Sequence, residues 1–228
     1  MKNFPHTRQL LKYASLPYGS FRGFVNVLAF IVFCVALPVE AMAKRIVIVA
    51  FGDSLTAGFG LPQGEGFTDQ LQASLRKEGH DVIVRNAGVS GDTTAAGLVR
   101  FDWAVGSDTD AVILELGAND ALRGLDPAVT RQNLSKILAR LQQKKVPVLL
   151  AGMRAPPNYG RHYRTLYDRL FPDLADQYDV LFYPFFLDGV AANRELNQSD
   201  GIHPNAKGVA VIVDRMLDRV EDLIGEVD

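Results

Sequence analysis

Four short segments of this 228-residue sequence place reactive or hydrogen-bonding side chains after apolar runs, and the last of them follows its run after a long loop. The first is Gly52-Asp53-Ser54, where an apolar run ends in an acid and a hydroxyl. A serine hydroxyl is a poor nucleophile until a neighbouring base takes its proton. Ser54 is therefore either a turn residue or a nucleophile that depends on a histidine elsewhere in the chain.

His203 is the best candidate for that base. It lies in the loop that precedes the last helical pattern, three residues after Asp200. One tight turn would place the Asp200 carboxylate against the imidazole and fix its tautomer. Helix capping is the competing role for both residues. His80 precedes the second expected strand, at the opposite edge of the sheet, and His162 lies in an arginine-rich helical stretch.

Two further residues could donate hydrogen bonds to the oxyanion of an ester-hydrolysis transition state. Gly91 opens an expected helical stretch, Asp92 to Phe101, and a glycine lets its backbone N–H approach a ligand closely. Asn119 follows an apolar run and can offer its side-chain amide. Each is also an ordinary turn residue when taken alone.

The elements that would position these residues alternate between apolar strands and amphipathic helices. The expected strands are Arg45–Phe51, Asp81–Arg85, Ala111–Leu116, Val146–Ala151 and Val180–Tyr183. Strands this apolar, separated by helices, predict a parallel sheet covered on both faces, which is a three-layer α/β/α sandwich. Ligands of such sheets bind at the carboxyl ends of the strands, where the four segments lie.

Prolines mark several of the expected helix boundaries. Asp126-Pro127 reads as an N-cap followed by a proline at the first helical position. Pro172 is expected to kink or end the helix whose apolar face begins at Tyr163. Pro204 can serve as the first residue of the last helix.

Residues 1–43 resemble a signal peptide, and residues 44–228 are expected to form one domain. Basic residues precede an 11-residue apolar run from Val27 to Leu37, and Ala41-Met42-Ala43 fits a signal-peptidase site. We predict cleavage after Ala43 and a periplasmic or secreted protein, with membrane anchoring if the segment is retained. The single cysteine, Cys34, would leave with the segment, which excludes a thiol nucleophile in the mature protein.

The charge and the glycine pattern argue against nucleic-acid and nucleotide binding. The formal net charge is −2, without a long run of one sign, so nucleic acid is not an expected partner. Gly58-Phe59-Gly60 follows the first expected strand, but Gln63 stands where a dinucleotide-binding motif has its third glycine.

Ser54, Gly91, Asn119 and His203 occur in the order of the four blocks that name the SGNH hydrolases, also called the GDSL family. The matching segments are Gly52–Leu55, Ser90–Asp92, Gly117–Asp120 and Asp200–His203. Within that family, the segments Asn86–Thr93, Glu115–Asp120 and Pro157–Gly160 resemble the bacterial group of acyl-CoA thioesterase I, lysophospholipase and arylesterase.

This resemblance implies a flavodoxin-like five-stranded parallel sheet and a carboxylic ester hydrolase that needs no metal or cofactor. Ser54 would be the nucleophile, His203 the base and Asp200 its orienting acid. The Ser54 N–H, the Gly91 N–H and the Asn119 side chain would form the oxyanion hole. An acyltransferase using the same acyl-enzyme remains the first alternative, and a non-catalytic binding module the second.

The loops after the strands carry the residues expected to form the substrate pocket. These residues are Leu122, Leu125, Met153, Pro157, Tyr159 and Phe185. Their apolar character predicts a small-molecule ester or lipid substrate with an acyl chain of medium length. Arg123 and Arg154 are the nearby cations that could meet a phosphate or a coenzyme A headgroup. No obligatory protein partner is expected.

Overall fold

A five-stranded parallel sheet forms the centre of the computed structural model, which describes residues 45–227. The strands are β1 (Ile46–Gly52), β2 (Val82–Gly88), β3 (Ala111–Glu115), β4 (Val148–Ala151) and β5 (Leu181–Tyr183). They lie in the order β2-β1-β3-β4-β5, and every neighbouring pair is parallel. This is the flavodoxin-like order, which confirms the predicted fold class.

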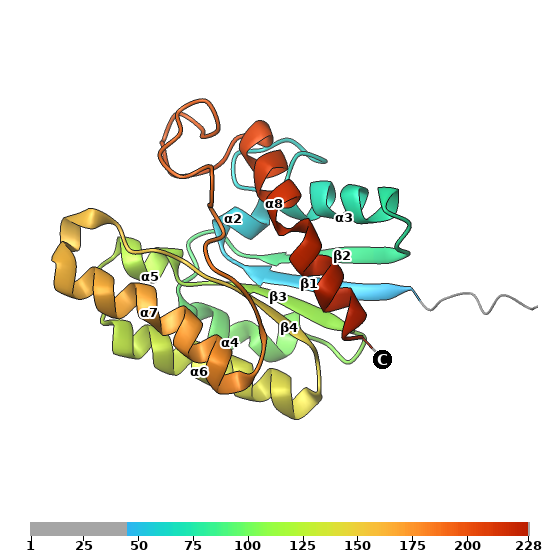
Figure 1. The fold of residues 1–228 in the computed structure, drawn as a ribbon, viewed down its shortest axis with the longest axis horizontal. Helices are drawn as coiled ribbons and strands as arrows, with labels where there is room; N and C mark the ends of the chain where they lie inside the picture. Colours follow the sequence, from blue (N-terminus) through green and yellow to red (C-terminus); the bar gives the residue numbers. More distant parts are fainter. Residues whose placement is uncertain (1–44, 228) are drawn as a thin grey trace, which may run out of the picture. The chain divides into compact units, whose positions relative to one another are not determined.

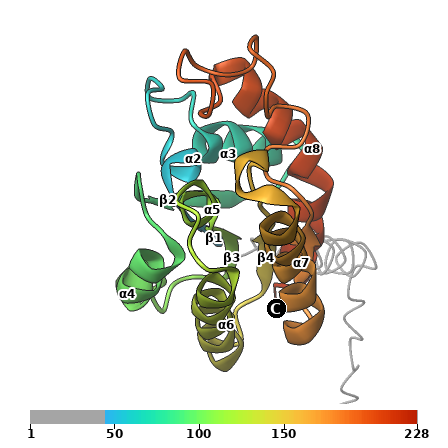
Figure 2. The ribbon, with the colours of Figure 1, turned by 90° about the vertical axis from the view of Figure 1, so that its left-hand side faces the viewer.

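Helices cover both faces of the sheet. The longer helices are α3 (Phe67–Lys77), α4 (Thr94–Ala104), α6 (Pro127–Lys144), α7 (Gly160–Tyr178) and α8 (Ala206–Gly225). Helices α3 and α8 pack together on one face, while α4, α6 and α7 lie side by side on the other (Figures 1 and 2). The three layers explain why every residue of β3 is buried and apolar up to Glu115, because neither face of this central strand meets solvent.

The strand predictions are correct in number, type and order, and their ends shift by up to three residues. The largest difference is β2, which continues past Arg85 to Gly88 because Asn86, Ala87 and Gly88 pair with the end of β1. Apolar periodicity does not mark these last residues, since they pair through backbone groups at the rim of the sheet.

Two expectations about helix boundaries are wrong, and one is confirmed. Pro172 lies inside α7, which runs on to Tyr178, so the helix does not end at the proline. Pro204 precedes α8, whose N-cap is Asn205: its side chain accepts a hydrogen bond from the Gly208 N–H. Helix α4 begins at Thr94 rather than at Asp92. Asp126 caps α6, with Pro127 in its first turn, as predicted.

The strand order changes direction between β1 and β3, and this places two of the reactive segments next to each other. From β1 the chain moves outward to β2, then returns to the other side of β1 to form β3. The short helices α2 (Ser54–Ala57) and α5 (Ala118–Leu122) follow β1 and β3 directly. The crevice at such a switch point is where doubly wound sheets bind ligands.

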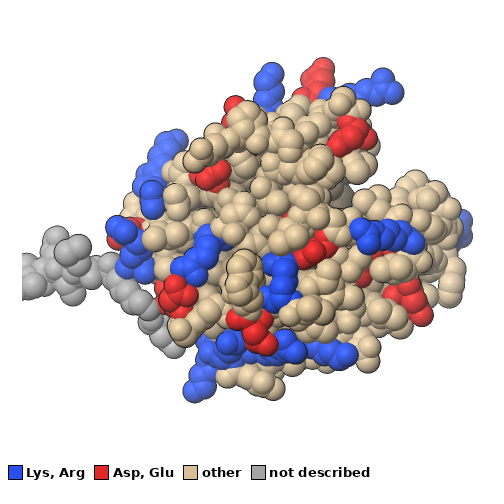
Figure 3. Space-filling view, turned by 180° about the vertical axis from the view of Figure 1, so that it is seen from behind, with Lys and Arg blue, Asp and Glu red and all other residues tan. Residues whose placement is uncertain are grey.

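The charge distribution on the surface and the lengths of the helices were compared with the expectations from the sequence. Basic and acidic side chains are interspersed over the face shown in Figure 3. Within residues 45–227, no helix is long and apolar enough to cross a membrane. The predicted signal peptide and its cleavage after Ala43 lie outside the described residues.

Candidate active site

Ser54 is the first residue of α2, immediately after β1. Asp53 is the N-cap of this short helix, and its Oδ1 accepts a hydrogen bond from the Leu55 N–H at 3.0 Å. The first N–H groups of a helix have no intrahelical acceptor, and the Ser54 N–H donates no hydrogen bond among the described residues, so it is available to a ligand. The turn needs Gly52, because a Cβ atom there would lie 2.1 Å from Thr56 Oγ1 and 2.4 Å from Glu115 Oε2.

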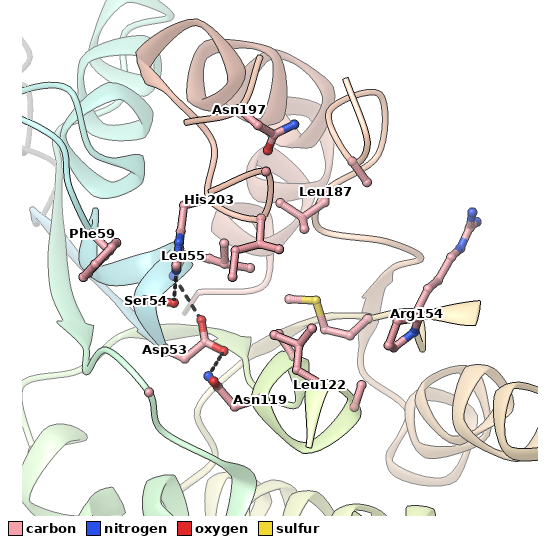
Figure 4. Close-up of a pocket in the computed structure, with 18 of the residues that line it drawn as sticks. Asp53, Ser54, Leu55, Phe59, Asn119, Leu122, Arg154, Leu187, Asn197 and His203 are labelled. Carbon is pink, nitrogen blue, oxygen red and sulfur yellow. Dashed lines mark hydrogen bonds between the residues drawn. The ribbon is translucent and has the colours of Figure 1, made fainter. Parts of the chain in front are cut away.

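A continuous hydrogen-bond chain joins Ser54, His203 and Asp200. His203 Nε2 lies 2.9 Å from Ser54 Oγ, and His203 Nδ1 lies 2.7 Å from Asp200 Oδ2 (Figure 4 shows the Ser54–His203 pair). An ionised Asp200 can only accept, so Nδ1 carries the proton and Nε2 is free to accept the Ser54 hydroxyl proton. This is the arrangement in which a histidine acts as a general base toward a serine.

Asp200 is stabilised in its charged form by a local turn. Its Oδ1 accepts hydrogen bonds from the backbone N–H groups of Ile202 and His203, both at 3.0 Å. The His203 side chain and these N–H groups lower the pKa of Asp200 to about 2. The carboxylate is therefore available to orient the imidazole across the physiological pH range.

The loop that carries His203 is tied to the loop after α2. Gln198 Nε2 donates to the carbonyl of Phe59 at 2.7 Å and to that of Pro204 at 2.9 Å. The Phe59 ring lies against the His203 ring, with centroids 4.6 Å apart. These contacts position the base relative to the nucleophile, although the two residues are 149 positions apart in the sequence.

Gly91 and Asn119, the predicted oxyanion donors, line the same pocket as Ser54. Gly91 has a φ of +85°, which side chains rarely adopt, and among the described residues its N–H donates no hydrogen bond. Both N–H groups of Asn119 are already used: Nδ2 donates to Asp53 Oδ2 and to the Asp92 carbonyl, each at 3.0 Å. Asn119 must therefore share or release one of these bonds when it donates to an oxyanion.

A pocket of about 330 Å³ opens beside these groups. Its lining includes Leu122, Met153 and Phe185, as the sequence predicted, together with Leu55, Phe59, Pro156, Leu187 and Ile202. The lining is mostly apolar, apart from the groups that surround Ser54 and from Arg154.

Leu125, Pro157 and Tyr159 are outside the pocket lining, contrary to the sequence-based expectation. Tyr159 turns toward the α5 loop, where its hydroxyl donates to the Leu122 carbonyl at 2.8 Å. Pro157 begins the 3-10 helix η1 (Pro157–Tyr159), so the preceding proline, Pro156, faces the pocket instead. The Leu125 carbonyl accepts from Tyr163 on the same outer surface.

The sequence and the fold agree with one family of known enzymes. The GDSL-like lipase/acylhydrolase family matches residues 50–211, a range that contains Ser54, Gly91, Asn119 and His203. The chain belongs to this family. Esterase TesA of Pseudomonas aeruginosa is 40% identical over 171 residues, which cover 75% of this chain and 84% of the relative.

Two further comparisons place the chain among the SGNH hydrolases. Thioesterase 1/protease 1/lysophospholipase L1 of Escherichia coli K12 is 34% identical over 193 residues, which cover 84% of this chain and 91% of the relative. The crystal structure of AlinE4, an SGNH-hydrolase family esterase, is 48% identical with a TM-score of 0.68. That alignment covers 80% of this chain and 98% of AlinE4.

A buried pair of carboxyl groups lies beneath the nucleophile of this SGNH hydrolase, and the sequence reading did not find it. Asp53 and Glu115 are both 0% exposed. Glu115 Oε2 accepts from Thr56 Oγ1 at 2.7 Å and from the Asp53 N–H at 3.2 Å, while its Oε1 has no partner among the described residues. The only sequence signal was an acid inside an apolar run.

Burial raises the pKa of both carboxyl groups. It raises the pKa of Asp53 to about 6, even though hydrogen bonds from Leu55 and Asn119 oppose the shift. Burial and the neighbouring Asp53 raise the pKa of Glu115 well above its ordinary value. A neutral Glu115 still accepts from Thr56 and from the Asp53 N–H, and so anchors the Asp53 turn without burying a charge.

Arg100 was also not predicted from the sequence, and its hydrogen bonds hold the loop that contains Gly91. Its Nε donates to Asp92 Oδ2 at 2.5 Å, and its terminal nitrogens donate to the carbonyls of Ala87 and Gly52 at 2.9 and 2.8 Å. The guanidinium also lies over the Phe51 ring, 4.3 Å from its centroid. One planar side chain thus joins the ends of β1 and β2 to the residue after Gly91.

The other two histidines of the described residues, His80 and His162, are not part of the site. His80 forms an ion pair with Glu221 at 3.4 Å, and His162 is exposed on α7. Among residues 45–227, no group of three or more His, Cys, Asp or Glu side chains is arranged to hold a metal ion.

Proposed function

We propose that this SGNH hydrolase is a serine esterase that hydrolyses carboxylic esters through an acyl-enzyme on Ser54. The observation that carries the proposal is the hydrogen-bond chain from Ser54 Oγ through His203 to Asp200, at 2.9 and 2.7 Å, beside an apolar pocket. A hydroxyl, a base of the correct tautomer and an orienting acid are the parts that acyl transfer requires.

In the first half of the reaction, Ser54 Oγ attacks the ester carbonyl while His203 Nε2 takes its proton. Asp200 stabilises the imidazolium that forms, without taking the proton itself. The N–H groups of Ser54 and Gly91, with the Asn119 amide, donate to the oxyanion. His203 then gives its proton to the leaving group, which departs as an alcohol or a thiol. The acyl group stays on Ser54.

In the second half, water attacks the acyl-enzyme. His203 takes a proton from the water and returns it to Ser54 Oγ as the carboxylic acid leaves. No metal or cofactor is needed for either half. Related proteins are named esterase and thioesterase/lysophospholipase, which supports aryl esters, thioesters and lysophospholipids as the substrates to test first.

The pocket lining gives this proposal a chain-length prediction. Each methylene buried against Leu122, Met153 and Leu187 stabilises the bound ester by roughly 0.8 kcal/mol. We expect kcat/KM for p-nitrophenyl esters to rise from acetate to medium chains and then to level off, with acetyl-xylan a poor substrate. A panel of C2 to C16 esters on the purified protein tests this, and acetate as the best acyl group would contradict it.

We also propose that the protein is exported and processed after Ala43. The support is in the sequence alone: a basic segment, the apolar run from Val27 to Leu37, and the Ala41-Met42-Ala43 site. Mass spectrometry of the protein from the extracytoplasmic fraction should find Lys44 at its N-terminus. A membrane-bound form that begins at Met1 would indicate an anchor instead.

A further inference from the structure

Arg154 is the only lysine or arginine among the pocket-lining residues. Figure 4 shows it at the opposite end of the pocket from Ser54 and His203, with Leu122 and Leu187 between. Its side chain is exposed, and in Figure 4 the guanidinium extends away from Ser54, on the outer side of the lining. A substrate with its carbonyl at Ser54 and an apolar segment along the lining would bring the far end of that segment toward Arg154.

Arg154 has no acidic partner in the described part of the chain. It contacts an aromatic ring instead: the guanidinium carbon lies 4.8 Å from the centroid of Phe185. By contrast, Arg100 is bound to Asp92, and Arg123, the other cation near the site, donates to the Gly91 carbonyl at 2.9 Å. Arg123 therefore supports the Gly91 loop, and Arg154 is the cation that remains free to meet a ligand.

Stacking on Phe185 orders the guanidinium without using its hydrogen-bonding capacity. An aromatic ring covers a face of the planar group, whereas the five N–H donors lie along its edge. An ordered guanidinium with free edge donors suits two parallel hydrogen bonds to a carboxylate or a phosphate. The rest of the lining offers no competing cation for such a group.

We propose that Arg154 forms an anion subsite at the outer end of the pocket and makes the enzyme prefer substrates that carry an acidic group there. The acidic group is a carboxylate or phosphate separated from the scissile carbonyl by an apolar segment. It belongs either to the far end of the acyl chain, as in a dicarboxylic acid half-ester, or to the leaving group. The inference rests on the proposed esterase function and assigns its substrate class.

The contribution of Arg154 should appear mainly in KM. The guanidinium lies away from the reacting carbonyl, so it binds the ground state and the transition state equally. Because the side chain is exposed, we expect a preference of about fivefold, which decreases as salt screens the pair.

The experiment compares two matched substrate pairs in wild type, Arg154→Met and a control. The first pair is the mono-p-nitrophenyl ester of suberic acid and p-nitrophenyl octanoate, which differ in an acyl-chain carboxylate. The second is the octanoyl thioester of 4′-phosphopantetheine and that of pantetheine, which differ in a leaving-group phosphate. Methionine keeps an apolar stem over Phe185, and Arg161→Met removes an exposed arginine of α7 outside the lining.

We expect the acidic-to-neutral ratio of kcat/KM to fall about fivefold in Arg154→Met for one of the two pairs, which identifies the source of the acidic group. The ratio should stay at the wild-type value in Arg161→Met. Unchanged ratios for both pairs in Arg154→Met, with neutral substrates still turned over, would overturn the anion subsite alone. Failure of the wild-type protein to hydrolyse any of the four substrates would overturn the proposed function, and the inference with it.

Discussion

The two halves of the active site are built in opposite ways. The nucleophile half, Ser54 with Asp53 and Glu115 beneath it, follows central strands and rests on carboxyl groups that are 0% exposed. The base half, His203 with Asp200, lies in an exposed loop before α8. Burial raises the pKa of the acids in the first half, whereas hydrogen bonds lower the pKa of the acid in the second.

The nucleophile half therefore provides fixed geometry, and the base half provides a charged group. A hydroxyl nucleophile needs a fixed geometry and no charge before reaction, so a buried network of hydrogen bonds suits it. An orienting acid must be ionised to stabilise the imidazolium, and an exposed turn supplies that state at little desolvation cost. The two halves meet at one hydrogen bond, between Ser54 Oγ and His203 Nε2.

Removing either partner of that hydrogen bond should cause the largest loss of esterase activity. We expect Ser54→Ala and His203→Ala each to lower kcat for p-nitrophenyl esters by about 10⁴-fold or more, because triad members act as a unit. Both variants should keep the circular dichroism spectrum and melting temperature close to those of the wild type. Near-wild-type turnover in either folded variant would contradict the mechanism, because it would show that Ser54 and His203 do not act together.

Asn119→Ala should give the next largest loss of activity. The substitution changes only the nucleophile half of the site. We expect kcat to fall by about 10²–10³-fold with little change in KM, because an oxyanion donor acts in the transition state. Steady-state kinetics on one medium-chain ester measures both constants. A change in KM alone would make Asn119 a substrate-binding residue.

Arg100→Lys should have a smaller effect of the same kind. Lysine keeps the charge near Asp92 but cannot reach the carbonyls of Gly52 and Ala87 together, so the Gly91 N–H is held less firmly. We expect a loss of about tenfold in kcat, because a displacement of about 1 Å in a positioned group can cost up to about 100-fold. Arg85→Lys, which changes an exposed ion pair with Asp108, is the matched control. Equal kinetics in the two variants would leave Arg100 without a positioning role.

The opposite pKa shifts also predict opposite pH effects on stability. The folded pKa of Glu115 is raised, so the unfolded state loses its proton first as pH rises above 4.5, and the free energy of unfolding falls. Glu115→Gln should remove that slope, which is at most about 1.4 kcal/mol per pH unit. Its stability relative to wild type should therefore increase as the pH rises above about 4.5.

Asp200→Asn should behave in the reverse sense. The folded pKa of Asp200 is lowered to about 2 from 3.8, so its contribution is present above pH 4 and is lost as the pH falls through 2. Urea unfolding of both variants and wild type from pH 2 to 7.5 tests the pair. Parallel stability curves for the two variants would mean that the two halves do not differ electrostatically.

The sequence predicts the parts of this arrangement that lie at strand ends. Ser54, Gly91, Asn119 and His203 stand in short segments after apolar runs, so the alternation of strands and helices was enough to bring them to one edge. The residues that support them could not be predicted in this way. Arg100 reads as an ordinary helix residue, and its three acceptors come from separate segments that only the fold brings together.

Loop residues were predicted less well, for a related reason. Pro156 rather than Pro157 faces the pocket, and Tyr159 turns outward to bond the Leu122 carbonyl. These orientations depend on turns and on single hydrogen bonds, which leave no periodic pattern in the sequence. The apolar character of the pocket could be predicted because it depends on composition, not on which neighbour faces inward.

Labelling with an alkyl fluorophosphonate tests the central claim most directly, because the reagent reacts with a serine that a base has activated. Peptide mass spectrometry of the labelled protein should find one phosphonyl group, on Ser54. The rate of labelling should fall by orders of magnitude in folded His203→Ala. A protein that is not labelled, or that carries the label on another residue, would contradict the account.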